Sequence, residues 1–184
     1  DDAQAAEIRQ RLLPIAQQIN QHLAACGFTL CKGNIMAGNP DLCLSRAEWA
    51  RRFAAFIREA TPENLLASTI YFDLRVVWGD EQGCEQLRRG ILGQVADNRL
   101  FQRMMADNAL RHRPPVGRFR EFVLERKGGD KATLDLKVQG LTPFVDGARL
   151  LALANGISAN NTLERLRQLV ALEVIEPLDG AAYE

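Results

Sequence analysis

The chain has 184 residues, of which 47% are apolar and 25% charged, and its 23 basic residues balance its 23 acidic residues. This length allows one sizeable hydrophobic core or two small ones. A chain without net charge has no global field that favours nucleic acid or anionic lipid, and no apolar run approaches the roughly 20 residues of a membrane helix. We therefore expect neither a nucleic-acid partner nor a membrane segment.

The four cysteines form no C-x-x-C pair, and the chain has only two histidines. A structural zinc site needs four such ligands at characteristic spacings, so a zinc site is not expected. Free, mostly buried thiols in a reducing cytoplasm are the simpler interpretation.

Residues 3–26 predict an amphipathic helix, because apolar side chains recur every three or four positions. Pro14 either kinks this helix or begins a shorter one, and Gly27 is suited to end it. Phe28–Cys31 then predict a short strand, which leads into a glycine-bearing loop at residues 31–40.

Helix-start signals recur along the rest of the chain. The sequence Ser45-Arg46-Ala47-Glu48 is a capping box, and Thr61-Pro62 predicts another helix start. Further starts are expected at the following four places: Asp80, Asn98, Thr142-Pro143 and Thr162. Segment 118–138 predicts either a hairpin or frayed helix ends around a turn at residues 127–130.

Residues 68–78 are rich in β-branched and aromatic side chains and predict a buried strand. A mixed α/β part before residue 80 and a helical part after it give the expected fold. We expect an α+β chain with a mixed sheet at residues 1–80, followed by a mainly helical bundle at residues 81–184.

On such a strand, Asp73 and Arg75 share one face. An ionised aspartate in an apolar strand needs a cation, a metal or several hydrogen-bond donors. One interpretation is a structural ion pair between the two side chains, which spacing alone favours. The other is a site in which Asp73 binds a divalent metal or orients a nucleophile and Arg75 contacts a phosphate.

The loop at residues 31–40 combines small residues, a lysine and two asparagines. Its glycines let a backbone approach phosphate oxygens, and Lys32 could add a point charge. The sequence is neither a Walker loop nor a dinucleotide fingerprint. A structured turn, in which Asn34 and Asn39 bond their own backbone, is at least as well supported.

Two further chemistries have little support. No G-x-S-x-G motif occurs, and the two histidines lie in helical surroundings, so a serine nucleophile is not expected. The one basic cluster could meet a phosphate or an acidic partner, although a solvated helix end is the simpler interpretation. Its members are Arg111, His112, Arg113, Arg118 and Arg120.

Three motifs in order resemble a known family. Two lie in the first half, with these residues: Gly27, Cys31, Lys32, Gly33, Met36, Ala37, Asn39, Pro40, Trp49, Phe72, Asp73, Arg75, Gly79 and Asp80. The third lies in the second half, with these residues: Asp135, Leu136, Lys137, Pro143, Asp146, Ala148, Arg149, Ala152, Leu153, Gly156, Thr162, Arg165 and Leu166. Together they resemble the nucleotidyltransferases of bacterial signal-transduction proteins, which are related to protein-PII uridylyltransferases.

The resemblance implies a catalytic domain followed by a helical substrate-binding domain, often behind cyclic-nucleotide-binding and CBS domains that act as sensors. It implies transfer of a nucleoside monophosphate from a nucleoside triphosphate to a protein or small-molecule hydroxyl, with Mg²⁺ as cofactor. Asp73 then matches a third catalytic carboxylate and weak metal ligand, with Arg75 as its companion. Cys31, Lys32, Gly33, Met36 and Asn39 match the wall of the nucleotide pocket.

The family also uses a Gly-Ser turn and a metal-binding D-x-D pair, and neither occurs in this sequence. The chain begins at Asp1 without an initiator methionine, and we expect it to be a piece of a longer protein that is inactive alone and binds no metal. The alternative is a non-catalytic module that docks a regulator or sensory domains. A truncated sheet would leave an unpaired edge, so a homodimer is also expected.

Overall fold

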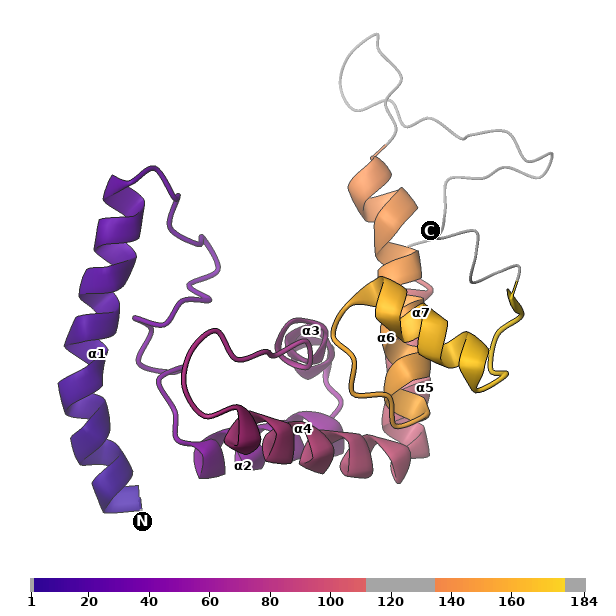
Figure 1. Ribbon diagram of the computed structural model, residues 1–184, viewed down its shortest axis with the longest axis horizontal. Helices are drawn as coiled ribbons and strands as arrows, with labels where there is room; N and C mark the ends of the chain where they lie inside the picture. Colours follow the sequence, from indigo (N-terminus) through magenta and orange to yellow (C-terminus); the bar gives the residue numbers. More distant parts are fainter. Residues whose placement is uncertain (1, 112–134, 178–184) are drawn as a thin grey trace, which may run out of the picture. The chain divides into compact units, whose positions relative to one another are not determined.

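The computed structural model describes residues 2–111 and 135–177, and within these ranges the chain is helical and has no strand. The expected α+β fold with a mixed sheet is therefore wrong for this part of the chain. The elements are α1 (Asp2–Ala25), α2 (Arg46–Arg58), α3 (Pro62–Tyr71), α4 (Glu81–Ala96), α5 (Arg99–Ala109), the π-helix η1 (Leu136–Leu141), α6 (Thr142–Ala154) and α7 (Thr162–Ala171), and Figure 1 labels the α-helices.

The chain divides into two compact units, Asp1–Arg52 and Phe53–Glu184, and each is described by itself. The division expected near residue 80 separates a mixed α/β part from a helical part. It stays a prediction, because compactness and function need not divide a chain at the same residue.

Helix α1 runs without a break through Pro14 and ends at a glycine cap. Gly27 adopts a φ of 98°, which favours glycine, and the Phe28 amide donates to the Leu23 carbonyl at 3.0 Å. This is the Schellman arrangement that closes a helix. The predicted stop at Gly27 is confirmed, whereas the strand expected at Phe28–Cys31 is wrong, because Phe28 closes the helix instead.

The strand expected at residues 68–78 is also wrong, because helix α3 continues to Tyr71. The Ser68 hydroxyl donates to the Asn64 carbonyl at 2.7 Å, so its hydrogen bond stays inside the helix. Phe72 follows and is 4% exposed, with its ring centroid 5.6 Å from that of Phe53. Phe72 is therefore buried against other helices, whereas Ile70, Val77 and Trp78 of the same segment are exposed.

Most helix starts follow the sequence signals. The Glu48 amide donates to the Ser45 hydroxyl, and the side chains of Thr61, Asp80 and Asn98 accept hydrogen bonds from backbone amides three positions ahead. Two starts differ from expectation. At α6 no side chain caps the helix, because Leu141 precedes it and the Thr142 hydroxyl donates to the Lys137 carbonyl, and at α7 Asn161 and not Thr162 accepts the capping hydrogen bond. These caps fix where α2, α3, α4, α5 and α7 begin.

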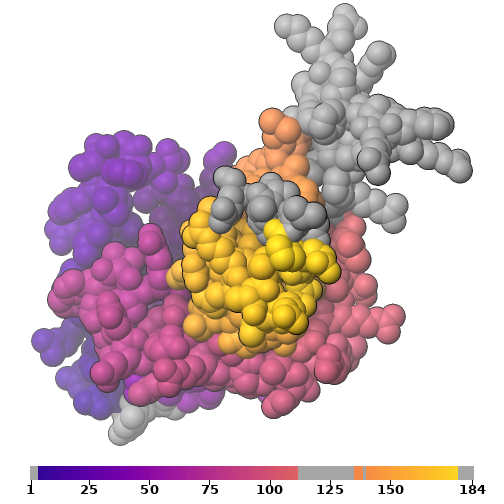
Figure 2. Space-filling model, turned by 45° about the vertical axis from the view of Figure 1, so that its right-hand side comes forward, coloured from indigo at the N-terminus to yellow at the C-terminus, as the bar shows by residue number. Residues whose placement is uncertain are grey.

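Helix α6 lies at the centre of the second unit, in contact with α4, α5, α7 and η1. Figure 2 shows the orange and yellow residues of α6 and α7 lying against the magenta and pink residues of α4 and α5. One buried cluster joins Ala152, Ile157 and Leu169. Another is aromatic, where the Phe72 ring packs against Phe53 and Phe101. These two clusters fix the helices that carry the candidate site.

Several expectations fall outside the described residues. They are the turn at residues 127–130 and the basic residues His112, Arg113, Arg118 and Arg120. Across residues 2–111 and 135–177, no helix has the length and apolar character needed to cross a membrane.

Candidate functional site

The Asp73 carboxylate lies in the turn after α3 and is held by two arginines. Arg149 on α6 donates to Asp73 Oδ2 through Nη2 at 2.7 Å and through Nε at 3.1 Å. Arg165 on α7 donates through Nη2 to the other oxygen, Oδ1. Both carboxylate oxygens are therefore engaged, and this arginine clamp joins three segments that are far apart in the sequence.

Both arginines of the clamp are buried, at 6% exposure for Arg149 and 2% for Arg165. Each lies on the apolar face of its helix, next to Ala148 and Leu166 respectively. A buried guanidinium is costly unless it is paired and hydrogen-bonded. Further partners meet part of this need, because Arg149 Nη1 lies 2.5 Å from Asp146 Oδ1 and Arg165 Nε donates to the Ala159 carbonyl at 2.8 Å. Arg165 Nη1 is buried and has no hydrogen-bond partner among the described residues.

The electrostatics follow from this geometry. Burial raises the pKa of Asp73, but the hydrogen bonds and charges of Arg149 and Arg165 outweigh burial, so its pKa lies below the ordinary value. Burial likewise lowers the pKa of Arg149, and the neighbouring carboxylates of Asp73 and Asp146 raise it overall. Asp73 and Arg149 are therefore both charged at neutral pH.

The segment that follows Asp73 is anchored by its backbone. The Leu74 carbonyl accepts a hydrogen bond from Arg88 Nη2 at 2.8 Å and another from Asn160 Nδ2 at 3.5 Å. Arg88 and Asn160 belong to no motif of the sequence, so the sequence did not predict that they contact this segment. Beyond this anchor Val77 and Trp78 are 90% and 93% exposed.

Three of the residues predicted in the helical-domain motif meet at this clamp: Asp146, Arg149 and Arg165. Arg75 does not join them. It is exposed, and the ion pairs of Asp73 are made with Arg149 and Arg165 instead. The shared strand face expected for Asp73 and Arg75 is therefore absent, since residues 72–80 form a turn and an irregular segment.

The remaining two motif residues lie at the start of η1. Asp135 Oδ1 accepts hydrogen bonds from the amides of Lys137 and Val138 at 3.1 and 2.9 Å. The Lys137 carbonyl in turn accepts from the Thr142 hydroxyl at 2.8 Å. Asp135 therefore caps a helix, while the roles implied for Asp135 and Lys137 in substrate binding stay predictions.

The loop at residues 31–40 belongs to the first unit and contains the structured turn that was one interpretation of its sequence. Asn39 Nδ2 donates to the Asn34 carbonyl at 2.9 Å, and Asn39 Oδ1 accepts from the Asp41 amide at 2.9 Å. The Gly38 amide donates to Asn20 Oδ1 at 2.8 Å, and a Cβ there would lie 2.7 Å from that oxygen. Gly38 thus permits the loop to approach α1.

The other members of the predicted nucleotide pocket lie along this loop. Cys31, Lys32 and Gly33 are exposed, whereas Met36 is half-buried. Because the loop and Asp73 belong to different units, the nucleotide-binding role of these residues stays a prediction.

A second ion pair stabilises the first unit. Arg9 Nη2 lies 2.5 Å from Glu48 Oε2, and Arg9 Nε donates to the Cys43 carbonyl at 2.5 Å. Glu48 Oε2 also accepts from the Ser45 amide at 2.7 Å, which completes the capping box. The hydrogen bond from Ser45 and the guanidinium of Arg9 lower the pKa of Glu48 to about 2.

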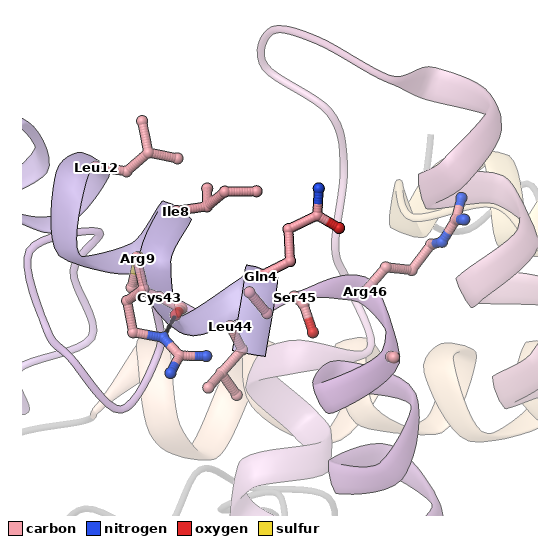
Figure 3. Close-up of a pocket in the computed structure, with 10 residues that line it drawn as sticks. Gln4, Ile8, Arg9, Leu12, Cys43, Leu44, Ser45 and Arg46 are labelled. Carbon is pink, nitrogen blue, oxygen red and sulfur yellow. Dashed lines mark hydrogen bonds between the residues drawn. The ribbon is translucent and has the colours of Figure 1, made fainter. Parts of the chain in front are cut away.

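A pocket of about 420 Å³ lies between α1 and the start of α2. Figure 3 shows Ile8, Arg9 and Leu12 on its α1 side, Leu44 and Ser45 opposite, and the hydrogen bond from Arg9 to Cys43 as a dashed line. The guanidinium of Arg9 is paired with Glu48, and the other α1 side chains that line the pocket are Gln4, Ala5, Ile8 and Leu12, most of which are apolar.

Metal ligation has no ready site in the described ranges. Within residues 2–111 and 135–177, no three His, Cys, Asp or Glu side chains lie together as a metal-binding group. At the clamp, arginine nitrogens engage both oxygens of Asp73, and Asp146 Oδ1 is paired with Arg149.

Two family models match the chain. Residues 1–63 match "Putative nucleotidyltransferase DUF294", and residues 99–184 match "Putative nucleotidyltransferase substrate binding domain". Together they support a nucleotidyltransferase family for this chain. Comparison with curated proteins and with solved structures gave no match.

The arginines and the aspartate of the clamp lie in different parts of the chain with respect to the two nucleotidyltransferase matches. Arg149 and Arg165 lie inside the substrate-binding match, whereas Asp73 lies in the stretch between the two matches. The clamp therefore connects the intervening stretch, with α3 and α4, to the substrate-binding helices.

Proposed function

We propose that this chain is part of a nucleotidyltransferase that moves a nucleoside monophosphate from a nucleoside triphosphate to a hydroxyl group of a protein or small molecule. The observation that carries the proposal is the order of the two matches, with the nucleotidyltransferase model first and its substrate-binding model second. The specific form is transfer like that of protein-PII uridylyltransferases, in a bacterial signal-transduction protein whose CBS or cyclic-nucleotide-binding domains regulate it.

Mg²⁺ is the proposed cofactor of the complete enzyme. In-line displacement at phosphorus develops negative charge on the attacking and leaving oxygens, which paired metal ions neutralise. A two-metal site needs several carboxylates, and the sequence contains no D-x-D motif. The 184 residues alone are therefore proposed to bind part of the substrate without transferring a nucleotide.

Asp73 has two proposed roles, as a third catalytic carboxylate or as a structural one. The arginine clamp favours the structural role. A metal ion at Asp73 would have to displace Arg149 and Arg165, and each displacement would leave a buried guanidinium with fewer partners. Asp73 would then position the substrate-binding helices without contacting the reacting atoms.

The alternative is a non-catalytic interaction module, and two tests separate it from the enzyme. The first is the reading frame on the N-terminal side of Asp1, where a Gly-Ser turn followed by D-x-D supports the transferase. A frame without those motifs supports the interaction module.

The second test is an assay of pyrophosphate release by the 184-residue chain with Mg²⁺ and each nucleoside triphosphate. We expect no release. Release by the wild type would show a complete active site in this chain, and its loss in an Asp73→Asn variant that circular dichroism shows to be folded would contradict the structural role of Asp73.

A further inference from the structure

One face of α1 exposes a continuous stripe of large aliphatic side chains. Each is between 46% and 54% exposed, and the spacing of three and four positions puts them on one side of the helix. We call this the α1 stripe, and it consists of Ile8, Leu12, Ile15, Ile19 and Leu23. Another face of α1 packs on the rest of the first unit through Arg9 and Asn20.

The first unit has no core of its own. No side chain of residues 4–52 is buried. The first buried residue of the described chain is Phe53, which belongs to the second unit. A unit of this size without a hydrophobic core is not expected to be stable by itself. A contiguous apolar stripe on a surface helix marks an interaction site.

We propose that the α1 stripe is an interface that binds the same stripe of a second copy of this chain, with the two helices antiparallel. This proposal does not depend on nucleotidyl transfer. It concerns the first unit, whereas the arginine clamp lies in the second.

The spacing of the stripe fits a two-fold axis. About a point between Ile15 and Ala16, Ile8 is the counterpart of Leu23 and Leu12 is the counterpart of Ile19. Two antiparallel copies therefore place aliphatic residues opposite one another along the whole stripe. Such self-complementarity is what an isologous interface requires.

The charges of α1 favour the antiparallel orientation. Every Asp, Glu, Lys and Arg of this helix lies within residues 2–11, and its second half carries only His22 as a titratable group. Antiparallel copies place Glu7 and Arg11 beside the uncharged half of the other helix. Parallel copies would place Glu7 near Glu7 and Arg11 near Arg11, and such like-charge pairs are unfavourable.

The α1 stripe is long enough for two copies to contact over most of the helix. A specific interface buries at least about 1,000 Å² in total. The five half-exposed aliphatic residues supply most of this area, and polar side chains along a helix about 36 Å long would have to supply the rest. The antiparallel arrangement also brings Leu23 of the second copy beside Ile8, which lines the pocket in Figure 3.

The test is the mass of the full chain in solution, measured by light scattering after size-exclusion chromatography. The wild type should have twice the chain mass of 20.5 kDa. Leu12→Glu/Ile19→Glu should give the monomer, whereas Gln10→Glu/Gln21→Glu, which adds the same charge on the opposite side of α1, should remain dimeric. A monomeric wild type, or a dimer that both variants retain, would overturn the proposal.

Cross-linking tests the orientation in a chain whose four cysteines are replaced by serine. Mixing Ile8→Cys with Leu23→Cys should give disulfide-linked dimers, and Ile8→Cys alone should not. Circular dichroism of each variant checks that α1 is still formed. Cross-linking of Ile8→Cys to itself, with none to Leu23→Cys, would contradict the antiparallel arrangement.

Discussion

Asp73 and Arg165 form an ion pair across 92 positions of the sequence, and the arginine is almost completely buried. Together with Arg149, Arg165 fixes α6 and α7 to the segment between the two nucleotidyltransferase matches. The candidate site is therefore a clamp between distant segments of the second unit, and its measurable consequences are mainly those of a buried charge network.

Asp73→Asn should lower the free energy of unfolding by about 2–4 kcal/mol, because it leaves two buried guanidinium groups without their shared counter-charge. Urea denaturation followed by circular dichroism measures this change. Arg75→Gln is the matched control, since Arg75 is exposed, and it should change stability by less than about 0.5 kcal/mol. A larger loss of stability in Arg75→Gln than in Asp73→Asn would instead support an ion pair between Asp73 and Arg75.

The effect of Asp73→Asn should depend on pH. The pKa of Asp73 is lowered in the folded chain, so its stabilisation is complete above the unfolded value of about 3.9 and is lost as pH falls through the folded value. The difference in stability between wild type and Asp73→Asn should therefore be constant from pH 7 to about 5 and shrink in acid. A difference that grows as the pH falls would contradict this linkage.

The Glu48 carboxylate should titrate with a pKa of about 2. NMR titration of the side-chain carboxyl carbon measures it directly. In Arg9→Gln the pKa of Glu48 should rise, but remain below the unfolded value of about 4.3, because the hydrogen bond from the Ser45 amide is retained. The contribution of Glu48 to stability is complete above that unfolded value and disappears as pH falls towards 2. An ordinary pKa in the wild type would contradict the capping-box geometry.

Asn98→Ala should cost more than Asn161→Ala, although both remove a helix cap. Asn98 accepts from the Phe101 amide and also donates to the Ile57 carbonyl at 3.1 Å, so we expect a loss of about 2 kcal/mol. Asn161 is exposed and caps only α7, so about 1 kcal/mol is expected. Chemical denaturation of the two variants compares them, and equal losses would mean that the Ile57 hydrogen bond contributes nothing.

Local signals predicted where helices begin and end, because capping depends on neighbouring residues. Ser45, Thr61, Asp80 and Asn98 cap helices where their sequences indicated, and Gly27 ends α1. The cap of α7 was predicted at Thr162 and lies one residue earlier, at Asn161, because asparagine caps helices as well as threonine does.

The strand expected at residues 68–78 failed for a tertiary reason. β-Branched and aromatic residues suit strands, but here α3 runs to Tyr71 and Phe72 packs its ring against Phe53 and Phe101 directly after the helix. The partners of Asp73 could not be read from spacing, because they lie 76 and 92 positions away. Arg149 and Arg165 on the apolar faces of their helices were the available signal, since a charge there needs a buried counter-charge.

The pattern on α1 was predicted correctly as an amphipathic helix, but its stripe is exposed in the described unit. Periodicity identifies an apolar face and says nothing about what covers it.

The most direct test of the central claim compares thermal unfolding of wild type and Asp73→Asn with Mg²⁺ and each nucleoside triphosphate. A ligand that binds the folded chain raises its melting temperature. If the arginine clamp commits Asp73 to structure, Mg²⁺ with nucleotide should shift both melting temperatures equally, by less than about 1 °C. A rise of several degrees in the wild type that is absent from Asp73→Asn would contradict the account, because it would make Asp73 a ligand of the metal-nucleotide complex.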